Sequence, residues 1–344
     1  MTLYLHSLAL RNFRNFKAKE VLFAPGINQI WGDNGQGKST LLEAIHLLST
    51  GRSFRTQHFA EMIREGEKSF SLHAEYEQEG RKVEVELFFD GKKKELRLDA
   101  TRYSSFQPLL GLFPLIVHMP HDAALIEGAP ALRRRLMNFH LSQSDSLYFH
   151  HLARFWRAMK QRNVLLKKED DLSIACWEEE MAPSALYLLE KRAAWVLSLY
   201  SPLLLHSGKL SEGKEEHLVR YHPSFTQNYR TELTQERSRA KELGFTLRGP
   251  HRDDISFWIG TRKTPLFGSE GQKKTAILAL KLAEWESLAK QKGTFPLFAI
   301  DDLGLPLDPG RLHRFYEELS HLGQVWITAP TALGSFPSHQ IHLA

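Results

Sequence analysis

Apolar runs mark two buried strands and two helices in the outer parts of the chain. The first run ends at 27–31, and after a polar loop apolar residues recur at helical spacing over 41–48. A second β-type run occupies 296–300, shortly after a strongly helical segment at 275–285. Strands combined with helices in this way predict an α/β fold.

The middle of the chain has a different pattern. Between 119 and 244 helical periodicity dominates, and β-type runs are few. We therefore predict a mainly α-helical lobe at 119–244, inserted between two parts of one head, 1–118 and 245–344. The longest apolar stretch, 193–205, is interrupted by polar residues and a proline. It is too short to span a bilayer, and we expect a buried helix there.

The loop that follows the first strand fits a phosphate-binding pattern. It reads WGDNGQGKST and matches G-x-x-x-x-G-K-[ST] without a mismatch. Its glycines allow positive φ and close approach to phosphates, Lys38 can reach the β/γ-phosphates, and Ser39 offers a hydroxyl to Mg²⁺. The alternative, a Gly/Asn-rich turn without function, is disfavoured by the strand and helix on either side. The predicted nucleotide-binding residues are Gly32, Asp33, Asn34, Gly35, Gln36, Gly37, Lys38, Ser39 and Thr40.

The second apolar run, PLFAIDDLG, ends in two adjacent carboxylates. Asp301 is placed to hold Mg²⁺ together with Ser39, and Asp302 to orient or deprotonate the attacking water. A turn or a helix cap is the alternative. Lys38 and Asp301 are 263 positions apart, which is too far for neighbouring strands of a small nucleotide-binding domain. We therefore predict an ATPase that is split by the helical lobe.

Composition narrows the class of protein. The 344 residues are 42% hydrophobic and 25% charged, as is typical of a soluble globular protein. The single cysteine, Cys176, excludes an intrachain disulfide and suits a reducing cytosol. The N-terminus lacks a secretory signal pattern, so we expect a cytoplasmic protein with no membrane association. The formal charge of +5 favours an anionic partner such as nucleic acid.

Basic residues concentrate near the start of the helical lobe. The segment 131–168 contains nine Lys or Arg residues and one acidic residue, Asp145. We predict sequence-independent contact with DNA phosphates, with a solvated helix face as the alternative. Neither a recognition-helix nor a zinc-finger pattern occurs in the sequence. The predicted DNA-binding residues are Arg133, Arg134, Arg135, Arg154, Arg157 and Lys160.

A glycine-flanked turn, LFGSEGQKK, leads into the helix at 275–285. Ser269 and Gly271 could donate hydroxyl and backbone N–H groups to a phosphate. However, the WGDNGQGKST loop of the same chain is already predicted to bind the phosphates of one ATP. A second phosphate-binding helix end implies a second subunit, and hence an ATP-dependent homodimer that shares each nucleotide. A plain helix cap is the alternative. The residues predicted to act in trans are Ser269, Glu270, Gly271 and Gln272.

Six segments, one of them within the phosphate loop, are distributed over nearly the whole chain: LRNFRNF, GDNGQGKS, GRSFRT, LIEGAPALRRR, KQRNVLLK and RGPHRDD. In this order they resemble the RecF family of bacterial DNA-repair proteins, which are relatives of the SMC and Rad50 ATPases. The resemblance implies an ABC-type P-loop ATPase head with a mixed sheet and a helical second lobe. It also implies ATP-dependent dimerisation, binding to double-stranded DNA near single-strand gaps, and cooperation with RecO and RecR to load RecA.

The resemblance further implies roles for single residues. Lys38 would hold the β/γ-phosphates of ATP, and Ser39 the metal ion. Asp301 would be the main Mg²⁺ carboxylate, and Asp302 would occupy the catalytic position. Asp308 matches an aspartate through which the two heads sense each other's occupancy.

Two departures from the family pattern lie at the predicted dimer seam. Glu270 stands where the family usually has Gln, and Leu305 and Pro306 replace a Ser-Glu pair. A carboxylate facing a γ-phosphate would repel it unless Lys273 and Lys274 offset the charge. Pro306 stiffens a loop that should communicate between subunits. We expect a weak, DNA-stimulated ATPase with slow hydrolysis.

Two other functions compete with this one. A metabolic P-loop kinase would leave the LFGSEGQKK turn and the basic segment unexplained. A nucleotide-gated DNA-binding scaffold with little or no hydrolysis would differ from the ATPase only in the roles of Asp302 and of the residues at the predicted dimer seam. Three residues of RGPHRDD, namely Arg248, His251 and Arg252, could contact nucleotide, interface or DNA, and the sequence does not choose among these roles.

Overall fold

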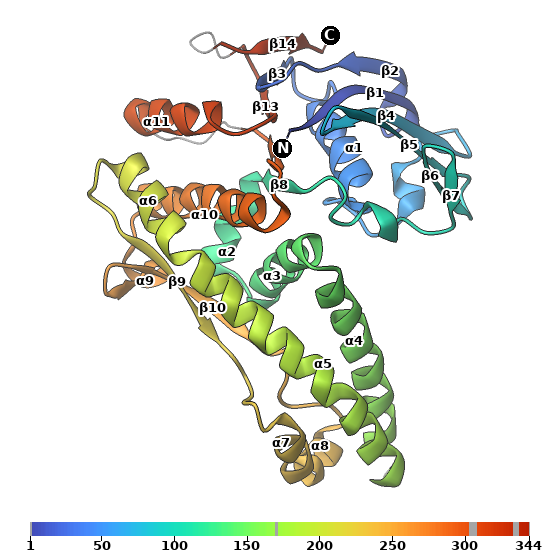
Figure 1. The fold of residues 1–344 in the computed structure, drawn as a ribbon, viewed down its shortest axis with the longest axis vertical. Helices are drawn as coiled ribbons and strands as arrows, with labels where there is room; N and C mark the ends of the chain where they lie inside the picture. Colours follow the sequence, from blue (N-terminus) through green and yellow to red (C-terminus); the bar gives the residue numbers. More distant parts are fainter. Residues whose placement is uncertain (1, 169–170, 303–307, 333–336, 344) are drawn as a thin grey trace. The chain divides into compact units, whose positions relative to one another are not determined.

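The computed structural model describes residues 2–168, 171–302, 308–332 and 337–343. The chain divides into two compact units, which Figure 1 shows in sequence colours. The head unit comprises residues 1–122, 209–211 and 280–344, and the helical unit comprises residues 123–208 and 212–279.

A parallel sheet lies at the centre of the head unit. Its strands are β3 (Ile27–Trp31), β8 (Leu115–His118), β12 (Leu297–Ile300), β13 (Val325–Ala329) and β14 (His339–His342). They lie in the order β14-β3-β13-β12-β8, and all neighbouring pairs are parallel. β12 and β13 are buried along their whole length, which explains their continuous apolar sequences. The carboxyl ends of β3 and β12 therefore lie at the same edge of the sheet, with β13 between them.

An antiparallel sheet forms the second layer of the head unit. Its strands are β1 (Leu3–Phe13), β2 (Phe16–Leu22), β4 (Phe70–Gln78), β5 (Arg81–Phe89), β6 (Lys94–Leu98) and β7 (Thr101–Tyr103). Their order is β2-β1-β4-β5-β6-β7. Burial alternates along β4 and β5, so one face packs on the core and the other faces solvent. The predicted α/β head is confirmed, with its parallel and antiparallel strands in separate sheets.

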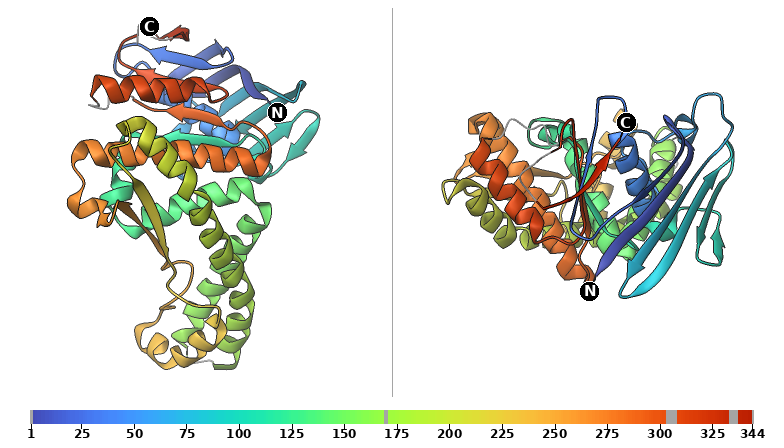
Figure 2. Two further views of the ribbon diagram at one scale, coloured as in Figure 1. Left: turned by 60° about the vertical axis from the view of Figure 1, so that its left-hand side comes forward. Right: turned by 90° about the horizontal axis from the view of Figure 1, so that it is seen from above.

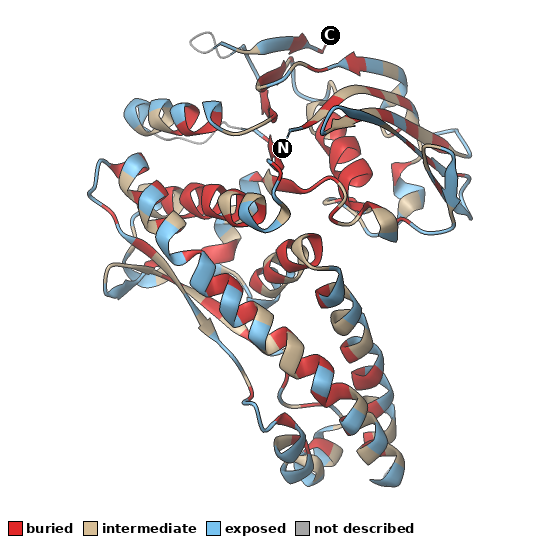
Figure 3. Ribbon diagram, viewed as in Figure 1, coloured by how far each residue is buried: buried red, intermediate tan, exposed pale blue. Residues whose placement is uncertain are grey.

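Helix α1 (Lys38–Thr50) packs between the two sheets. It contacts β8 and β13 of the parallel sheet and β4 of the antiparallel sheet, and every residue from Thr40 onward is buried (Figure 3). Helix α11 (Pro309–Ser320) covers the other face of the parallel sheet (Figure 2). The head unit also contains the short 3-10 helices η1 (Phe59–Met62) and η2 (Gln107–Leu109) and most of η3 (Pro120–Ala123).

The helical unit is built on two long helices that pack along each other, α4 (Ser146–Leu166) and α5 (Asp171–Ser198). The Asp145 side chain caps α4 by accepting the backbone N–H groups of Leu147 and Tyr148. The remaining helices are α2 (Ala124–Glu127), α3 (Pro130–Ser144), α6 (Tyr200–Ser211), α7 (Tyr229–Gln235), α8 (Arg237–Leu243), α9 (Thr264–Phe267) and α10 (Glu270–Lys292). The division between the units falls within α6 and α10.

A three-stranded antiparallel sheet also belongs to the helical unit. β10 (Asp254–Ile259) pairs with β9 (His217–His222) on one side and with β11 (Arg262–Lys263) on the other. The predicted boundary at 244/245 separates β9 from its partner, and the compact unit extends to residue 279. Periodicity alone does not show this pairing, because β9 and β10 are joined through two helices and a loop.

Candidate nucleotide-binding site

The loop after β3 forms a turn that ends at the N-terminus of α1. Gly35 and Gly37 have φ angles of 87° and 100°, in the region that side chains disfavour. Lys38 Nζ donates to the carbonyl oxygens of Gly32 (2.6 Å) and Asp33 (2.8 Å), so the cation is held within the loop. The first turn of α1 contains no acidic residue, and its N–H groups and dipole favour an anion. The predicted strand–loop–helix arrangement is confirmed.

Two positions of this loop must be glycine because segments distant in sequence approach them closely. A Cβ atom on Gly32 would lie 2.2 Å from the carbonyl oxygen of Leu343. A Cβ atom on Gly37 would lie 2.4 Å from the ring of Phe16. The residue after β14 and the first residue of β2 therefore help to define the position of the loop.

Asp301 and Asp302 follow β12 and share a partner on β13, Thr328. The Thr328 hydroxyl donates to Asp301 Oδ1 (3.0 Å) and accepts the backbone N–H of Asp302 (2.7 Å). Asp301 is buried, whereas Asp302 is exposed and lines a cavity with Thr328. Thr328 was not predicted from the sequence, although it lies in an apolar run, VWIT, that follows a helix as the run before Asp301 does.

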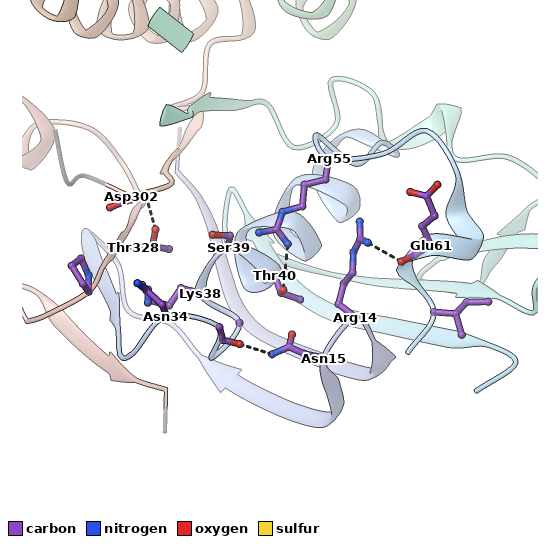
Figure 4. Close-up of a pocket in the computed structure, with 14 residues that line it drawn as sticks. Arg14, Asn15, Asn34, Lys38, Ser39, Thr40, Arg55, Glu61, Asp302 and Thr328 are labelled. Carbon is purple, nitrogen blue, oxygen red and sulfur yellow. Dashed lines mark hydrogen bonds between the residues drawn. The ribbon is translucent and has the colours of Figure 1, made fainter. Parts of the chain in front are cut away.

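An open cavity of about 740 Å³ joins these elements (Figure 4). Its volume suits a small-molecule ligand, and its lining includes the cations Lys38, Arg14 and Arg55, which favour a phosphate chain. The lining residues are Arg14, Asn15, Asn34, Gly35, Gly37, Lys38, Ser39, Thr40, Arg55, Glu61, Ile63, Asp302, Thr328 and Pro330. Six of the nine predicted loop residues, Thr40 included, thus line one cavity with Asp302.

Several lining residues were given no role from the sequence. Arg14 and Asn15 come from the turn between β1 and β2, and Asn15 Nδ2 donates to the Gly35 carbonyl (3.4 Å). Arg55 comes from the loop after α1. All three lie in LRNFRNF or GRSFRT, the segments on which part of the family resemblance rests, so a signal for them was present.

The oxygen atoms at this edge of the sheet fit a magnesium ion. Ser39 lines the cavity, and Asp301 directly precedes the lining residue Asp302. A serine hydroxyl and an aspartate carboxylate are the hard oxygen ligands that Mg²⁺ prefers.

The turn predicted to act in trans begins α10 in the helical unit. Ser269 Oγ accepts the backbone N–H of Gln272 (3.3 Å), and Gln272 Oε1 accepts the N–H of Ser269 (2.9 Å), which is a capping box. Glu270 is exposed and pairs with Lys273 (2.9 Å), which also pairs with Glu127. The hydrogen bond from Lys273 lowers the pKa of the Glu270 carboxyl. The expected offset of the Glu270 charge by Lys273 is therefore present.

Among the predicted DNA-binding residues, Arg133 is buried within the helical unit. Its guanidinium group is buried and donates to both carboxylate oxygens of Asp254 (2.7 and 2.9 Å). It also donates to the carbonyl oxygens of Leu125 (3.1 Å) and Gly128 (2.7 Å). Four hydrogen bonds within the protein engage the Arg133 guanidinium group, which favours a structural role in the helical unit over phosphate contact.

The other predicted DNA-binding residues differ in exposure. Arg135, Arg157 and Lys160 are exposed. Arg134 is half-buried and donates to the Asp253 carbonyl (3.0 Å), and Arg154 forms a bidentate pair with Glu180.

The RGPHRDD segment has structural contacts within the helical unit. Arg248 pairs with Glu236 (2.6 Å). The His251 ring stacks on Phe155 and contacts the Thr246 carbonyl oxygen through Nε2 (3.0 Å). Burial lowers the pKa of His251 to about 4.

Two residues that follow Arg252 anchor further contacts. Asp253 is fully buried and accepts from Arg192 Nη1 (2.7 Å) and the Tyr221 hydroxyl (2.5 Å). Asp254 is the partner of Arg133. Arg252 lies 5.4 Å from the centre of the Phe245 ring.

The predicted communication residue caps a helix. Asp308 Oδ1 accepts the backbone N–H of Arg311 (2.9 Å) at the start of α11, and this bond lowers the pKa of Asp308. Leu305 and Pro306, the other departures at the seam, lie outside the described residues. Among the helices of the described residues, none has both the length and the apolar character required to cross a membrane.

Comparisons with known proteins identify the family. Residues 7–168 match the family described as "AAA domain". The DNA replication and repair protein RecF of Protochlamydia amoebophila is 38% identical over 94% of this chain and 93% of its own length. A solved structure of the recombination mediator protein RecF with ATPrS, in the RecFOR pathway, has a TM-score of 0.91 at 28% identity, covering 100% of this chain and 96% of that one.

A more distant structure supports the ABC-type fold of the head. The Smc head domain of Pyrococcus furiosus, bound to a ScpA domain, has a TM-score of 0.55 at 16% identity, covering 95% of this chain and 90% of that one. This likeness shows that the fold is shared with the Smc head domain. Given the extent and identity of the match to RecF, the chain belongs to the RecF family of DNA replication and repair proteins.

Proposed function

We propose that this protein is an ATP-dependent DNA-binding protein of recombinational repair and replication. The observation that carries the proposal is the single cavity that brings together the β3–α1 loop, Thr328 and Asp302. Loop glycines, a lysine and a helix N-terminus recognise phosphates, and a carboxylate at the same cavity can act on water. The solved relative with ATPrS supports ATP as the nucleotide.

The roles follow from the positions of the side chains. Lys38 exchanges its two loop carbonyls for the β/γ-phosphates when ATP enters. Ser39 and Asp301 hold Mg²⁺, which neutralises phosphate charge when bound. Asp302 orients the attacking water, and its backbone is anchored by the Thr328 hydroxyl at 2.7 Å.

Each nucleotide is completed by a second copy of the chain. At the N-terminus of α10, Ser269 and Glu270 are exposed and Gly271 is half-buried; backbone N–H groups and the helix dipole at such an end attract a phosphate. Lys273, which Glu270 shares with Glu127, offsets part of the Glu270 charge at that start. ATP therefore drives dimerisation, Asp308 takes part in communication between heads, and slow hydrolysis releases the dimer.

The dimer binds double-stranded DNA at single-strand gaps and helps RecO and RecR to load RecA. The RecFOR pathway named for the solved relative supports this assignment. Arg135, Arg157 and Lys160 supply exposed cations for the DNA backbone. We place the protein in the cytoplasm, where its DNA substrate lies.

Sedimentation tests this function most directly. The protein is run with ATP, with ADP and without nucleotide, each with and without gapped duplex DNA. We expect a dimer with ATP alone, and a DNA-bound dimer with ATP and gapped DNA. A monomer in all six conditions would contradict the proposal, and so would steady-state turnover above about 10 s⁻¹, the median for enzymes.

A scaffold that binds ATP without hydrolysing it is the alternative, and Asp302 separates the two functions. If hydrolysis releases DNA, Asp302→Asn should leave a stable DNA-bound dimer in ATP. A scaffold would give the same dimer lifetime in the variant and the unmodified protein. Lys38→Met should abolish the ATP-dependent dimer in both cases, which controls for nucleotide binding.

A further inference from the structure

A buried carboxylate on α1 joins two arginines of the cavity wall. Glu43 is completely buried and accepts from Arg14 through Nη2 (2.6 Å) and Nε (3.0 Å). Its second contact is with Arg55 Nη1 (3.4 Å), and the Ser53 hydroxyl donates to it as well (2.5 Å). One carboxylate therefore links the β1–β2 turn, the helix that follows the phosphate loop and the loop after that helix.

Both arginines also face the cavity. Their side chains keep 21% and 40% exposure, whereas Glu43 has none, and both line the cavity wall (Figure 4). Arg14 Nη1 donates to the Glu61 carbonyl (2.7 Å), and Arg55 Nη1 lies 3.5 Å from Thr40 Oγ1. The two guanidinium groups thus stand at the Thr40 side of the loop.

We propose that Glu43 is a positioning residue for nucleotide binding, which holds Arg14 and Arg55 so that their remaining N–H groups meet the phosphate chain beside Thr40. The inference rests on the proposed function, because it names residues of the same ATP site. The Thr40 end of the loop follows Lys38, which serves the β/γ-phosphates. The arginines therefore contact phosphate that ATP and ADP have in common.

The change in nucleotide affinity caused by Glu43→Gln has opposite signs for a pure charge effect and for a positioning role. Glu43 contributes one negative charge next to two positive ones, so Glu43→Gln makes the cavity wall more positive. If only net charge mattered, this variant would bind ATP more tightly. If Glu43 positions the arginines, the variant binds more weakly, because a guanidinium group without its bidentate partner samples other rotamers.

The experiment measures ATP and ADP affinity by calorimetry for the full chain and its variants. We expect Glu43→Gln to weaken both nucleotides about tenfold, the effect of losing roughly one charge-assisted hydrogen bond. Arg55→Gln, at a partly exposed position where folding is not at risk, should weaken both as well. The losses should be less than additive in the double variant, since the two residues act through one contact.

Glu178 supplies a matched control in the helical unit. It is likewise a buried carboxylate with two arginine partners, Arg162 (2.9 Å) and Arg237 (2.5 Å). Glu178→Gln should lower the thermal stability and leave the nucleotide affinity unchanged, so it separates a general folding loss from positioning.

The outcomes are distinct. Tighter or unchanged nucleotide binding by Glu43→Gln, a loss confined to ATP, or fully additive losses with Arg55→Gln would overturn the role of Glu43. Failure of the unmodified protein to bind either nucleotide would instead overturn the proposed function itself.

Discussion

We expect that replacing Arg133 by alanine destabilises the helical unit. We do not expect it to remove a contact with DNA phosphates. The side chain is buried, with 8% of the residue exposed. It spans from α3 to Asp254 at the start of β10 and also satisfies two backbone carbonyl groups. The substitution removes these contacts together and leaves the Asp254 carboxylate without its bidentate partner.

The magnitude follows from the burial of the pair. Loss of one partner from a buried ion pair costs about 3–5 kcal/mol. The Asp254 side chain is 29% exposed, so water can solvate part of the carboxylate and the lower end applies. We therefore expect a loss of about 3 kcal/mol in the free energy of unfolding for Arg133→Ala. Arg135→Ala, two positions away but exposed, should change it by less than about 0.5 kcal/mol.

Urea denaturation measures the free energy of unfolding, and a salt titration measures how the affinity for duplex DNA depends on salt. A variant with Arg135, Arg157 and Lys160 replaced by alanine should unfold normally but show a shallower salt dependence, by up to about 0.9 for each lost phosphate contact. The reasoning is refuted if Arg133→Ala unfolds at the same urea concentration as the unmodified protein while its salt dependence becomes shallower.

Three further predictions concern other parts of the molecule. Gly37→Ala should abolish ATP binding measured by calorimetry, because the added Cβ would lie 2.4 Å from the Phe16 ring at a φ of 100°; a bound nucleotide would contradict this. Glu270→Gln should strengthen the proposed ATP-dependent dimer in sedimentation, since it removes a carboxylate from the helix start that we propose faces a phosphate; a weaker dimer would show that the carboxylate supports the proposed dimer interface. The pKa of His251 is lowered to about 4, so the unfolded chain binds a proton that the folded chain does not bind between pH 6.5 and 4. Stability in urea should therefore fall as pH decreases through this range, and His251→Leu should reduce that fall; an equal pH dependence in both proteins would exclude His251 as its source.

Local features of the nucleotide site could be predicted from the sequence because consecutive residues produce them. A phosphate loop needs glycines, a lysine and a hydroxyl at fixed spacing within one turn, and Gly35 and Gly37 do adopt positive φ. The carboxylates after β12 could be found for a similar reason, since a fully buried strand is apolar throughout. Parallel pairing then brings both strand ends to one edge.

Other members of the site could not be assigned, because they meet only through folding. Thr328 reaches the carboxylates because β13 lies between β3 and β12. Arg14 and Arg55 are gathered by Glu43, a contact between three separate segments. Their segments carried a family resemblance but no local pattern that indicates a cavity wall.

The three consecutive arginines at 133–135 show what the sequence could not predict. Spacing and composition are enough to predict the split α/β head, the phosphate loop and the presence of a basic helix, because local patterns encode them. The folded chain was needed to show that Arg133 contacts Asp254, 121 positions later, while Arg135 faces solvent. A helix places these two residues on different faces, but which face is buried depends on the partner that folding brings to it.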